Sequence, residues 1–292
     1  MNRSIMLGLW LLSLMVLGAC DQFPSKPPYQ KEIVVFGFLW GNKPMTDERA
    51  IMISYTQPID QIYDVDEAVI SNARVIITEL GSGNRYVLRD AKRPGFYFND
   101  SLIAIPRKTY RLEVDVGDRI VIGETTVPYE LDIRTSLSSN GIDSVFYDNL
   151  SIEKPIYVSC EDGGQIIIID VYCHESWQNA EYINPFWGKT KPSDAAEYGG
   201  QDGNSEPRHI IASAKYRDLF SSNFPGHYVI DWYASMIGFY GAYTIQVLAI
   251  DDNYYRFLNR KEYPELQSGL KGGIGVFGSV CGETFRLYIM KR

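Results

Sequence analysis

Short runs of alternating apolar and polar residues fill the first part of the chain, and this period of two constrains the fold more than any other feature. In Tyr110–Val116 the even positions are apolar and the odd ones charged, which is typical of a strand with one buried face. Seven such runs within about 95 residues predict an immunoglobulin-like or transthyretin-like β-sandwich over residues 32–128. The expected strands are Ile33–Trp40, Ala50–Tyr55, Arg74–Leu80, Arg85–Arg89, Gly95–Phe98, Thr109–Val116 and Arg119–Val127.

Residues 129–292 are also rich in strand patterns but less regular. One helix is expected from Asp252 to about Glu262, with Asp251 or Asp252 as its N-cap and Pro264 as its stop. The sequence therefore predicts an all-β protein with a second, irregular β-sandwich domain that carries one short helix. Its expected strands are Asp143–Leu150, Ile156–Ser159, Gln165–Tyr172, His209–Lys215, His227–Met236, Ala242–Ile250, Gly275–Val280 and Thr284–Met290.

The N-terminus has the pattern of an exported lipoprotein. Arg3 precedes the apolar stretch Ile5–Leu17, which has signal-peptide length and is shorter than the ~20 residues of a membrane span. Leu17-Gly18-Ala19-Cys20 then matches a lipobox. We expect residues 1–19 to be a signal peptide and Cys20 to be lipidated, the alternative being an ordinary signal peptide with a chance cysteine. Several acyl chains on Cys20 would anchor the chain stably in a membrane.

Residues 20–31 follow as a lipid-anchored tether with three prolines. Proline-rich chain favours an extended spacer of ~3.1 Å per residue. The mature chain would have 273 of the 292 residues, and loss of Arg3 would change the net charge from −8 to −9. This acidic balance argues against a nucleic-acid partner, because binding to phosphates needs a clustered basic face.

A long irregular stretch, residues 175–208, interrupts the second region. Four aromatic residues stand in its first half: Trp177, Tyr182, Phe186 and Trp187. Loops of this length in a compact domain are usually functional or disordered. We expect these rings to be candidate contacts for a partner or a ligand. The alternative is that they pack as a small local core at the end of the sandwich.

Motifs that would indicate catalysis or a cofactor fail on their context. Cys173-His174-Glu175 lacks the second histidine of a metalloprotease helix, since Gln178 stands there. Gly273–Gly278 matches a dinucleotide-binding motif by its letters, but glycines in a strand more often mark a bulge or a close backbone approach. The acidic run Tyr63–Glu67 does not fit a calcium-loop frame, which favours a solvated loop. We therefore expect no catalytic residue, no metal site and no cofactor.

Three cysteines follow the expected anchor: Cys160, Cys173 and Cys281. An exported protein is in a compartment that permits disulfides, but three cysteines leave at least one thiol free or paired between chains. Their pairing stays open, and we expect a structural role.

Several segments follow one another in a characteristic order: the lipobox, Ile33–Leu39, Arg93–Tyr97, Tyr110–Val116, Thr125–Pro128, Ile250–Leu258 and Gly272–Gly278. This order resembles the domain of unknown function 4249 family of Bacteroidota lipoproteins. One departure is Arg107-Lys108, where the family pattern has a tight-turn glycine before Tyr110. The resemblance implies an outer-membrane lipoprotein, often encoded beside a TonB-dependent receptor of the starch-utilisation type, and it transfers no catalytic residue.

The leading hypothesis is a non-enzymatic accessory lipoprotein that binds a ligand or an outer-membrane receptor. The ligand and the membrane face, periplasmic or external, stay open. A second hypothesis is a structural or assembly factor of an outer-membrane complex. A third is an enzyme that acts on glycans or peptides, since carboxylates are plentiful although none is marked by its context.

Overall fold

The computed structural model describes residues 29–184, 188–199, 208–219, 228–230, 232–259, 262 and 267–292. The expected signal peptide, Cys20 and most of the tether therefore lie outside the described residues. Contacts divide the chain into residues 1–31 with 57–62, and residues 32–56 with 63–292. The fold described below is that of the second unit. Among the described helices, none has the length and hydropathy that a membrane span requires.

The first region forms the expected strands. In β7 the buried side chains are Tyr110, Leu112 and Val114, so the predicted period of two is confirmed. The elements are β1 (Ile33–Trp40), β2 (Pro44–Met45), η1 (Asp47–Arg49), β3 (Ile51–Tyr55), α2 (Val65–Ala68), β4 (Arg74–Glu79), β5 (Arg85–Asp90), β6 (Phe96–Ile103), β7 (Thr109–Asp115) and β8 (Ile120–Thr126).

The turn before β7 explains the departure at Arg107. Its φ is +68°, in the left-handed region that glycine adopts most easily. The Arg107 N–H donates to the Val127 carbonyl oxygen at 2.8 Å, so the end of β8 holds this conformation. Arginine therefore occupies a backbone position that suits glycine.

The second region is less regular, and several expectations about it are wrong. The expected strand His227–Met236 is a three-residue strand followed by a 3-10 helix, the strand expected to reach Leu150 ends at Phe146, and the helix from Asp252 ends at Leu258. The elements are β9 (Asp132–Thr135), β10 (Ile142–Phe146), η2 (Tyr147–Asn149), α3 (Leu150–Glu153), β11 (Ile156–Ser159), β12 (Ile166–Cys173), α4 (Ala195–Gly199), β13 (His209–Lys215), η3 (Tyr216–Asp218), β14 (Tyr228–Ile230), η4 (Trp232–Met236), β15 (Gly241–Ile250), α5 (Asp252–Leu258), β16 (Gln267–Ser268), β17 (Leu270–Lys271) and β18 (Ile274–Met290).

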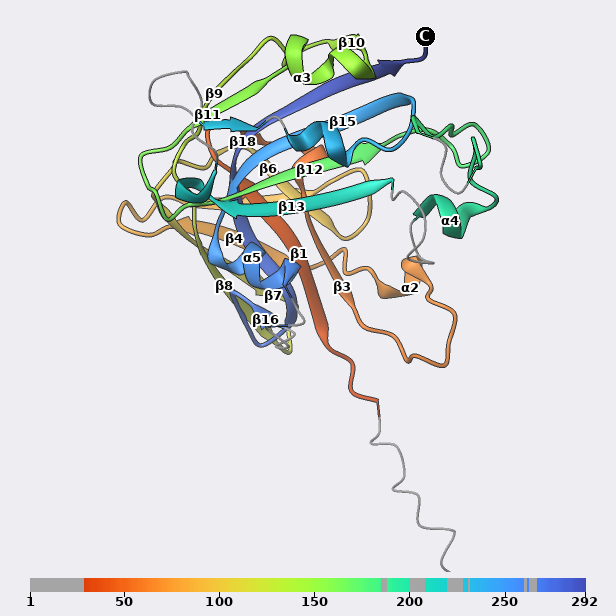
Figure 1. Ribbon diagram of the computed structural model, residues 1–292. Coiled ribbons are helices and arrows are strands. Elements are labelled where there is room, and N and C mark those ends of the chain that lie inside the picture. The colour runs from red at the N-terminus through yellow and green to blue at the C-terminus, as the bar shows by residue number, and fades with distance from the viewer. Residues whose placement is uncertain are drawn as a thin grey trace, which may run out of the picture. The chain divides into compact units, whose positions relative to one another are not determined.

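One long strand, β18, connects the two regions. Its first half runs parallel to β1 and its second half antiparallel to β15, and Figure 1 shows these strands side by side. The large sheet has the order β13-β12-β15-β18-β1-β3-β6-β5-β4-β7-β8-β17, and β14-β11-β9 form a separate small sheet. The expectation of two strands, Gly275–Val280 and Thr284–Met290, is wrong because the chain stays extended through Gly282.

Close backbone approach explains the glycines near the start of β18. Gly275 has a φ of +106°, and a Cβ there would lie 2.1 Å from the Val35 carbonyl oxygen. Any side chain would separate β18 from β1. The expectation of a close approach, rather than of a phosphate-binding loop, is confirmed.

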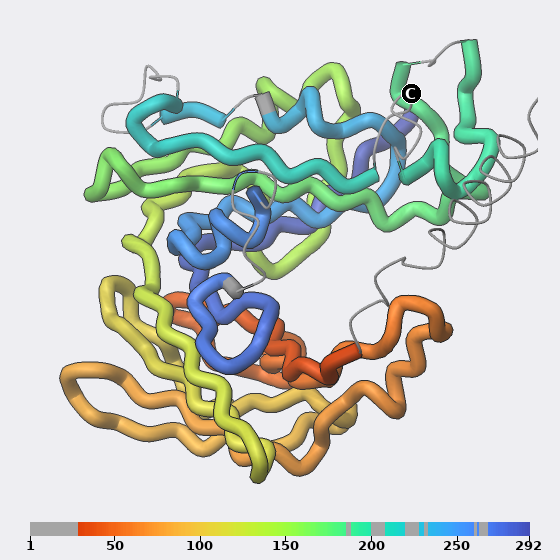
Figure 2. The backbone as a smooth tube through the Cα atoms, turned by 90° about the horizontal axis from the view of Figure 1, so that it is seen from below, coloured from red at the N-terminus to blue at the C-terminus, as the bar shows by residue number. Residues whose placement is uncertain are grey.

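Two hydrophobic cores fill the protein, and the all-β fold class is confirmed. The first core draws on β1 to β8 but also includes Leu270 and Phe277 from the C-terminal segment. The second core lies among β9 to β18. In Figure 2 the blue strands β15 and β18 lie between the red strand β1 and the green strand β12. The boundary at residue 128 stays a prediction, since the last strand contributes to both cores.

Candidate functional site

One face of the C-terminal sheet carries polar side chains at the positions that alternate with its core residues. Ile169, Val171 and Ile245 belong to the second core, so their strand neighbours point to the opposite side of the sheet. The pairings place these neighbours in two rows across β12, β15 and β18. We call this surface the open face, and its rows are Asp170, Gln246, Thr284 and Tyr172, Thr244, Arg286.

Helix α5 limits the open face. Tyr254 and Leu258 pack against a small apolar cluster that contains Ile168, Leu248 and Val280. The N-cap of the helix is Asp251, whose carboxylate accepts from the Tyr254 N–H at 3.0 Å. Helix α5 therefore covers the apolar side chains of this cluster, and the two polar rows lie beside it.

Two histidines lie at the edge of the open face. His209 Nε2 is 2.8 Å from Asp170 Oδ1, and His174 Nε2 is 2.7 Å from Thr244 Oγ1. Both imidazoles contact the Tyr172 ring edge to face, with centroid distances of 5.3 and 5.0 Å. Burial raises the pKa of Asp170, and the neighbouring His209 opposes that shift. These contacts fix the rings and engage both histidines within the protein.

A groove of about 430 Å³ lies beside the open face, and we call it the Trp40 groove. The Arg49 guanidinium lies over the Trp40 ring, 5.2 Å from its centroid, and donates to the Pro44 carbonyl oxygen at 3.1 Å. Arg286 is exposed, and within the described chain no hydrogen bond or ion pair engages it. The residues that line the groove are Trp40, Glu48, Arg49, Ser139, Asn140, Gly141, Gln246, Thr284 and Arg286.

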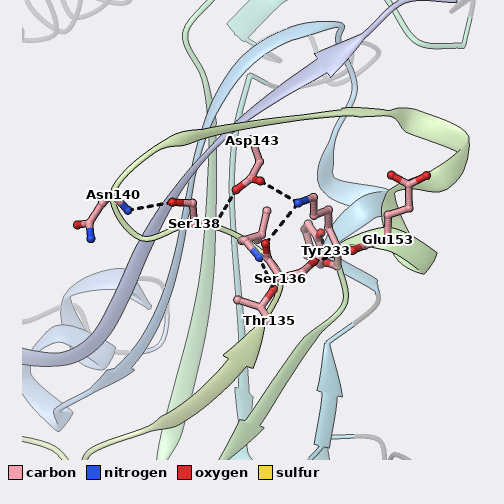
Figure 3. Close-up of polar contacts among 9 residues, drawn as sticks. Thr135, Ser136, Ser138, Asn140, Asp143, Glu153 and Tyr233 are labelled. Carbon is pink, nitrogen blue, oxygen red and sulfur yellow. Dashed lines mark hydrogen bonds and ion pairs between the residues drawn. The ribbon is translucent and has the colours of Figure 1, made fainter.

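A largely buried ion pair holds one wall of the Trp40 groove. Lys154 Nζ lies 2.8 Å from Asp143 Oδ1, and the exposed side-chain fractions are 15% and 19%. The other oxygen of Asp143 accepts from the Ser138 N–H at 2.6 Å, next to the lining residues Ser139–Gly141. The Tyr233 hydroxyl donates to the Lys154 carbonyl oxygen, which connects η4 to the residue that follows α3. Figure 3 shows Asp143, Ser138 and Tyr233 in this network. The hydrogen bonds from the Lys154 ammonium and from the Ser138 N–H both lower the pKa of Asp143.

A larger groove of about 600 Å³ lies where β8, β12 and the start of α5 meet. Asp251 lines this groove and accepts from the Thr125 hydroxyl at 2.6 Å, and that hydroxyl is 2.7 Å from Ser279 Oγ. Burial raises the pKa of Asp251 to about 6 although these donors oppose the shift. The carboxyl group thus joins the helix, β8 and β18. Since its oxygens are engaged by groups of the fold, we assign it a structural role.

The aromatic residues expected in a contact surface lie in different environments. Tyr182 is 3% exposed and stacks on Phe239 with centroids 4.9 Å apart, so its contact role does not fit its burial. Trp177 is partly buried against the second core. This arrangement matches the alternative of a local core. Phe186 and Trp187 lie outside the described residues, and their role stays a prediction.

The cysteines behave as structural residues. Cys160, Cys173 and Cys281 are all free, and the last two are buried. The expectation that at least one thiol is unpaired is confirmed. In the part of the chain that the structure describes, no three side chains of metal-ligating type come together.

An exposed apolar segment was missed from the sequence. Ile59 and Ile62, between β3 and α2, are 98% and 97% exposed. The following residues Tyr63 and Val65 are 55% and 58% exposed. Ile59 and Ile62 belong to the first unit of the chain. These two isoleucines could have been found as contact residues, but the acidic residues near them indicated only a solvated loop.

Comparison with known proteins gives one family. The model described as "Domain of unknown function (DUF4249)" matches residues 21–280. The chain belongs to this family. A search of the curated proteins gives no match to this DUF4249 chain. Among solved structures, Escherichia coli alpha-2-macroglobulin activated by porcine elastase aligns at 12% identity and a TM-score of 0.18, over 90% of this chain and 24% of that one. The chain thus spans about a quarter of that protein, and a similarity this weak carries no argument.

Proposed function

We propose that this DUF4249 chain is a non-enzymatic outer-membrane lipoprotein, anchored through Cys20, that binds a ligand or a receptor as an accessory component of a TonB-dependent transporter. The lipobox and the family support the membrane location. The Trp40 groove is the observation that carries the binding role. Its volume of about 430 Å³ is within the ~300–1,000 Å³ of small-molecule sites, and it offers an arginine that nothing in the described chain engages.

Binding is favoured over catalysis by the carboxylates around the groove. Hydrolysis of a glycoside uses two carboxyl groups that flank the bond to be broken, roughly 5–10 Å apart. Among the described lining residues of the Trp40 groove, Glu48 alone carries a carboxylate. Asp251, whose pKa burial raises to about 6, lines the larger groove and is engaged by the fold.

Co-purification tests this proposal. The full chain and a Cys20→Ala variant would be expressed in cells and extracted from membranes with a mild detergent. We expect the full chain in the membrane fraction, together with a receptor or a bound ligand, and the variant in the soluble fraction. Recovery of the membrane-bound chain alone, with neither receptor nor ligand, would count against the proposal.

A second candidate is a structural or assembly factor, favoured by the exposed side chains of Ile59 and Ile62. Exposed apolar side chains that lie close together in the chain can form part of a contact surface. The variant pair Ile59→Ser/Ile62→Ser and the single variant Arg286→Gln separate the candidates. An assembly factor loses its partner in the first variant alone, whereas a ligand-binding protein loses its ligand in the second.

A further inference from the structure

The two arginines that line the Trp40 groove differ in the contacts that their guanidinium groups make. Arg49 is fixed by the Trp40 ring and by the Pro44 carbonyl oxygen. Arg286 stands on β18, where its strand neighbours in the register are Thr244 on β15 and Ile142 on β10, neither of which is charged. A planar guanidinium with free N–H groups matches the two oxygens of a carboxylate. Arg286 is therefore the strongest anion-binding group of the groove.

The remaining walls present hydrogen-bonding groups in place of apolar ones. Gln246 Nε2 donates to Thr284 Oγ1 at 3.2 Å, which leaves the amide oxygen and the threonine proton for other partners. Ser139, Asn140 and Glu48 add further donors and acceptors. Trp40 supplies the one large apolar side chain among the described lining residues, so an apolar peptide side chain finds no pocket here.

We propose that the Trp40 groove binds a carboxylate-bearing sugar of the uronic-acid type, with its carboxylate on Arg286 and its hydroxyls on Glu48, Gln246 and Thr284. This inference rests on the proposed binding function and names the ligand class of the same site. Sugar hydroxyls both donate and accept, so they suit walls that mix amides, hydroxyls and a carboxylate. A neutral sugar would leave the charge of Arg286 unmatched.

The wall formed by Ser139–Gly141, which leads into Ile142 beside Arg286, is held in place before a ligand arrives. The Asp143–Lys154 pair fixes the backbone of Ser138, and Ser138 Oγ accepts from the Asn140 N–H at 3.3 Å. A wall held in this way loses little conformational entropy on binding. Asp143 and Lys154 are therefore positioning residues for the groove, since neither lines it.

Calorimetry on the detergent-solubilised mature chain tests the ligand class. The probes are digalacturonic acid, the uncharged disaccharide of galactose, and an acidic tetrapeptide of equal charge to the first. Arg286→Gln removes the charge from the groove. The matched control is Arg89→Gln, which removes an exposed arginine on β5 that pairs with Asp100.

We expect the acidic disaccharide to bind the wild-type chain, and Arg286→Gln to weaken it by at least about tenfold, because hydrogen bonds to charged groups are the stronger ones. The Arg89→Gln control should keep the wild-type affinity. Equal binding of the uncharged disaccharide, preference for the tetrapeptide, or an unchanged affinity in Arg286→Gln would each overturn the inference. None of these results affects co-purification with a receptor, so failure here is distinguishable from failure of the proposed function.

Discussion

Asp143 and Asp251 are both partly buried aspartates that hold a groove wall, but their partners differ. Asp143 faces the Lys154 ammonium at 2.8 Å, and its pKa is lowered chiefly by this hydrogen bond. Asp251 receives hydrogen bonds from Thr125 and from the backbone of Tyr254, and burial raises its pKa to about 6. The two carboxyl groups therefore differ both in burial and in the charge of their donors: burial dominates at Asp251, and the Lys154 hydrogen bond dominates at Asp143. The first site keeps its charge at neutral pH, whereas the second takes up a proton just below it.

Removal of the cation should have the largest effect. Lys154→Met leaves Asp143 without its counter-charge, and breaking a buried pair from one side typically costs ~3–5 kcal/mol. Because both side chains keep some exposure, we expect the free energy of unfolding to fall by about 3 kcal/mol. Urea unfolding at pH 7 measures this change.

The matched control for Lys154→Met removes both charges. In Asp143→Asn/Lys154→Met no charge stays unpaired, so we expect at least half of the lost stability to return. If the single variant lost less than about 1 kcal/mol, the pair would behave as a surface contact and the contrast with Asp251 would fail.

Asp251→Ala should have the next largest effect. The variant loses the N-cap of α5 and leaves the Thr125 hydroxyl without its carboxylate acceptor. Loss of a cap costs ~0.5–2 kcal/mol, and loss of the hydrogen bond from Thr125 adds to it although that hydroxyl keeps Ser279 Oγ as a partner, so we expect about 2 kcal/mol in urea unfolding. The control is Asp252→Ala, since Asp252 is exposed and stands one position after the cap; it should change stability by less than about 0.5 kcal/mol. Equal effects at the two positions would contradict the capping role.

The contrast also indicates how much of the fold the sequence predicts. Strand β1 and the alternation of β7 follow from a period of two, because each is a local pattern. The pairing of β1 with β18 joins residues about 240 positions apart, and no local pattern encodes it. The sequence predicts a break around Gly282, between Gly275–Val280 and Thr284–Met290, whereas β18 continues through this glycine with a φ of +157°.

The candidate site was less predictable than the strands. Trp40 ends the expected strand Ile33–Trp40 on the same period-two face as Phe36 and Phe38, and nothing in this local pattern marks it as a binding residue. Arg286 stands at a polar position of a strand, as many charged residues of this chain do. Only the register of β18 brings it to the same groove as Trp40. The aromatic stretch suggested a surface because its composition is unusual, yet Tyr182 stacks in the core. The composition of a segment shows that aromatic residues are frequent there. The burial of each aromatic ring depends on contacts with residues distant in the sequence.

The titration of Asp251 should make the stability of the fold depend on pH. The pKa of Asp251 is about 6 in the folded protein, above its ordinary value of 3.8, so the folded state binds the proton more tightly than the unfolded state. The stability contributed by this group therefore rises as the pH falls through 6. Relative to Asp251→Asn, which does not titrate, we expect wild-type stability to rise by about 1 kcal/mol between pH 7 and pH 5.

Urea unfolding of both proteins at several pH values measures this difference. Asp143, whose pKa is lowered, should contribute no change in that window and lose its stabilising effect only as the pH falls below about 4. An unchanged difference between wild type and Asp251→Asn from pH 7 to pH 5 would mean that the carboxyl group of Asp251 is solvated like an ordinary one.

The smallest effect is expected where the geometry of an ion pair is good but burial is absent. Arg89 and Asp100 lie 2.7 Å apart, about as close as Lys154 and Asp143, yet their side chains are 63% and 59% exposed. Water screens such a pair, so Asp100→Asn should cost less than about 0.5 kcal/mol in urea unfolding at low salt and still less at 0.5 M salt. The Arg89 guanidinium stays in place in this variant because it also lies 4.8 Å from the Phe98 ring centroid. A cost above about 1 kcal/mol would show that distance, and not burial, sets the strength of ion pairs in this fold. The opposite pKa shifts of Asp143 and Asp251 would then depend on the cation beside Asp143 alone.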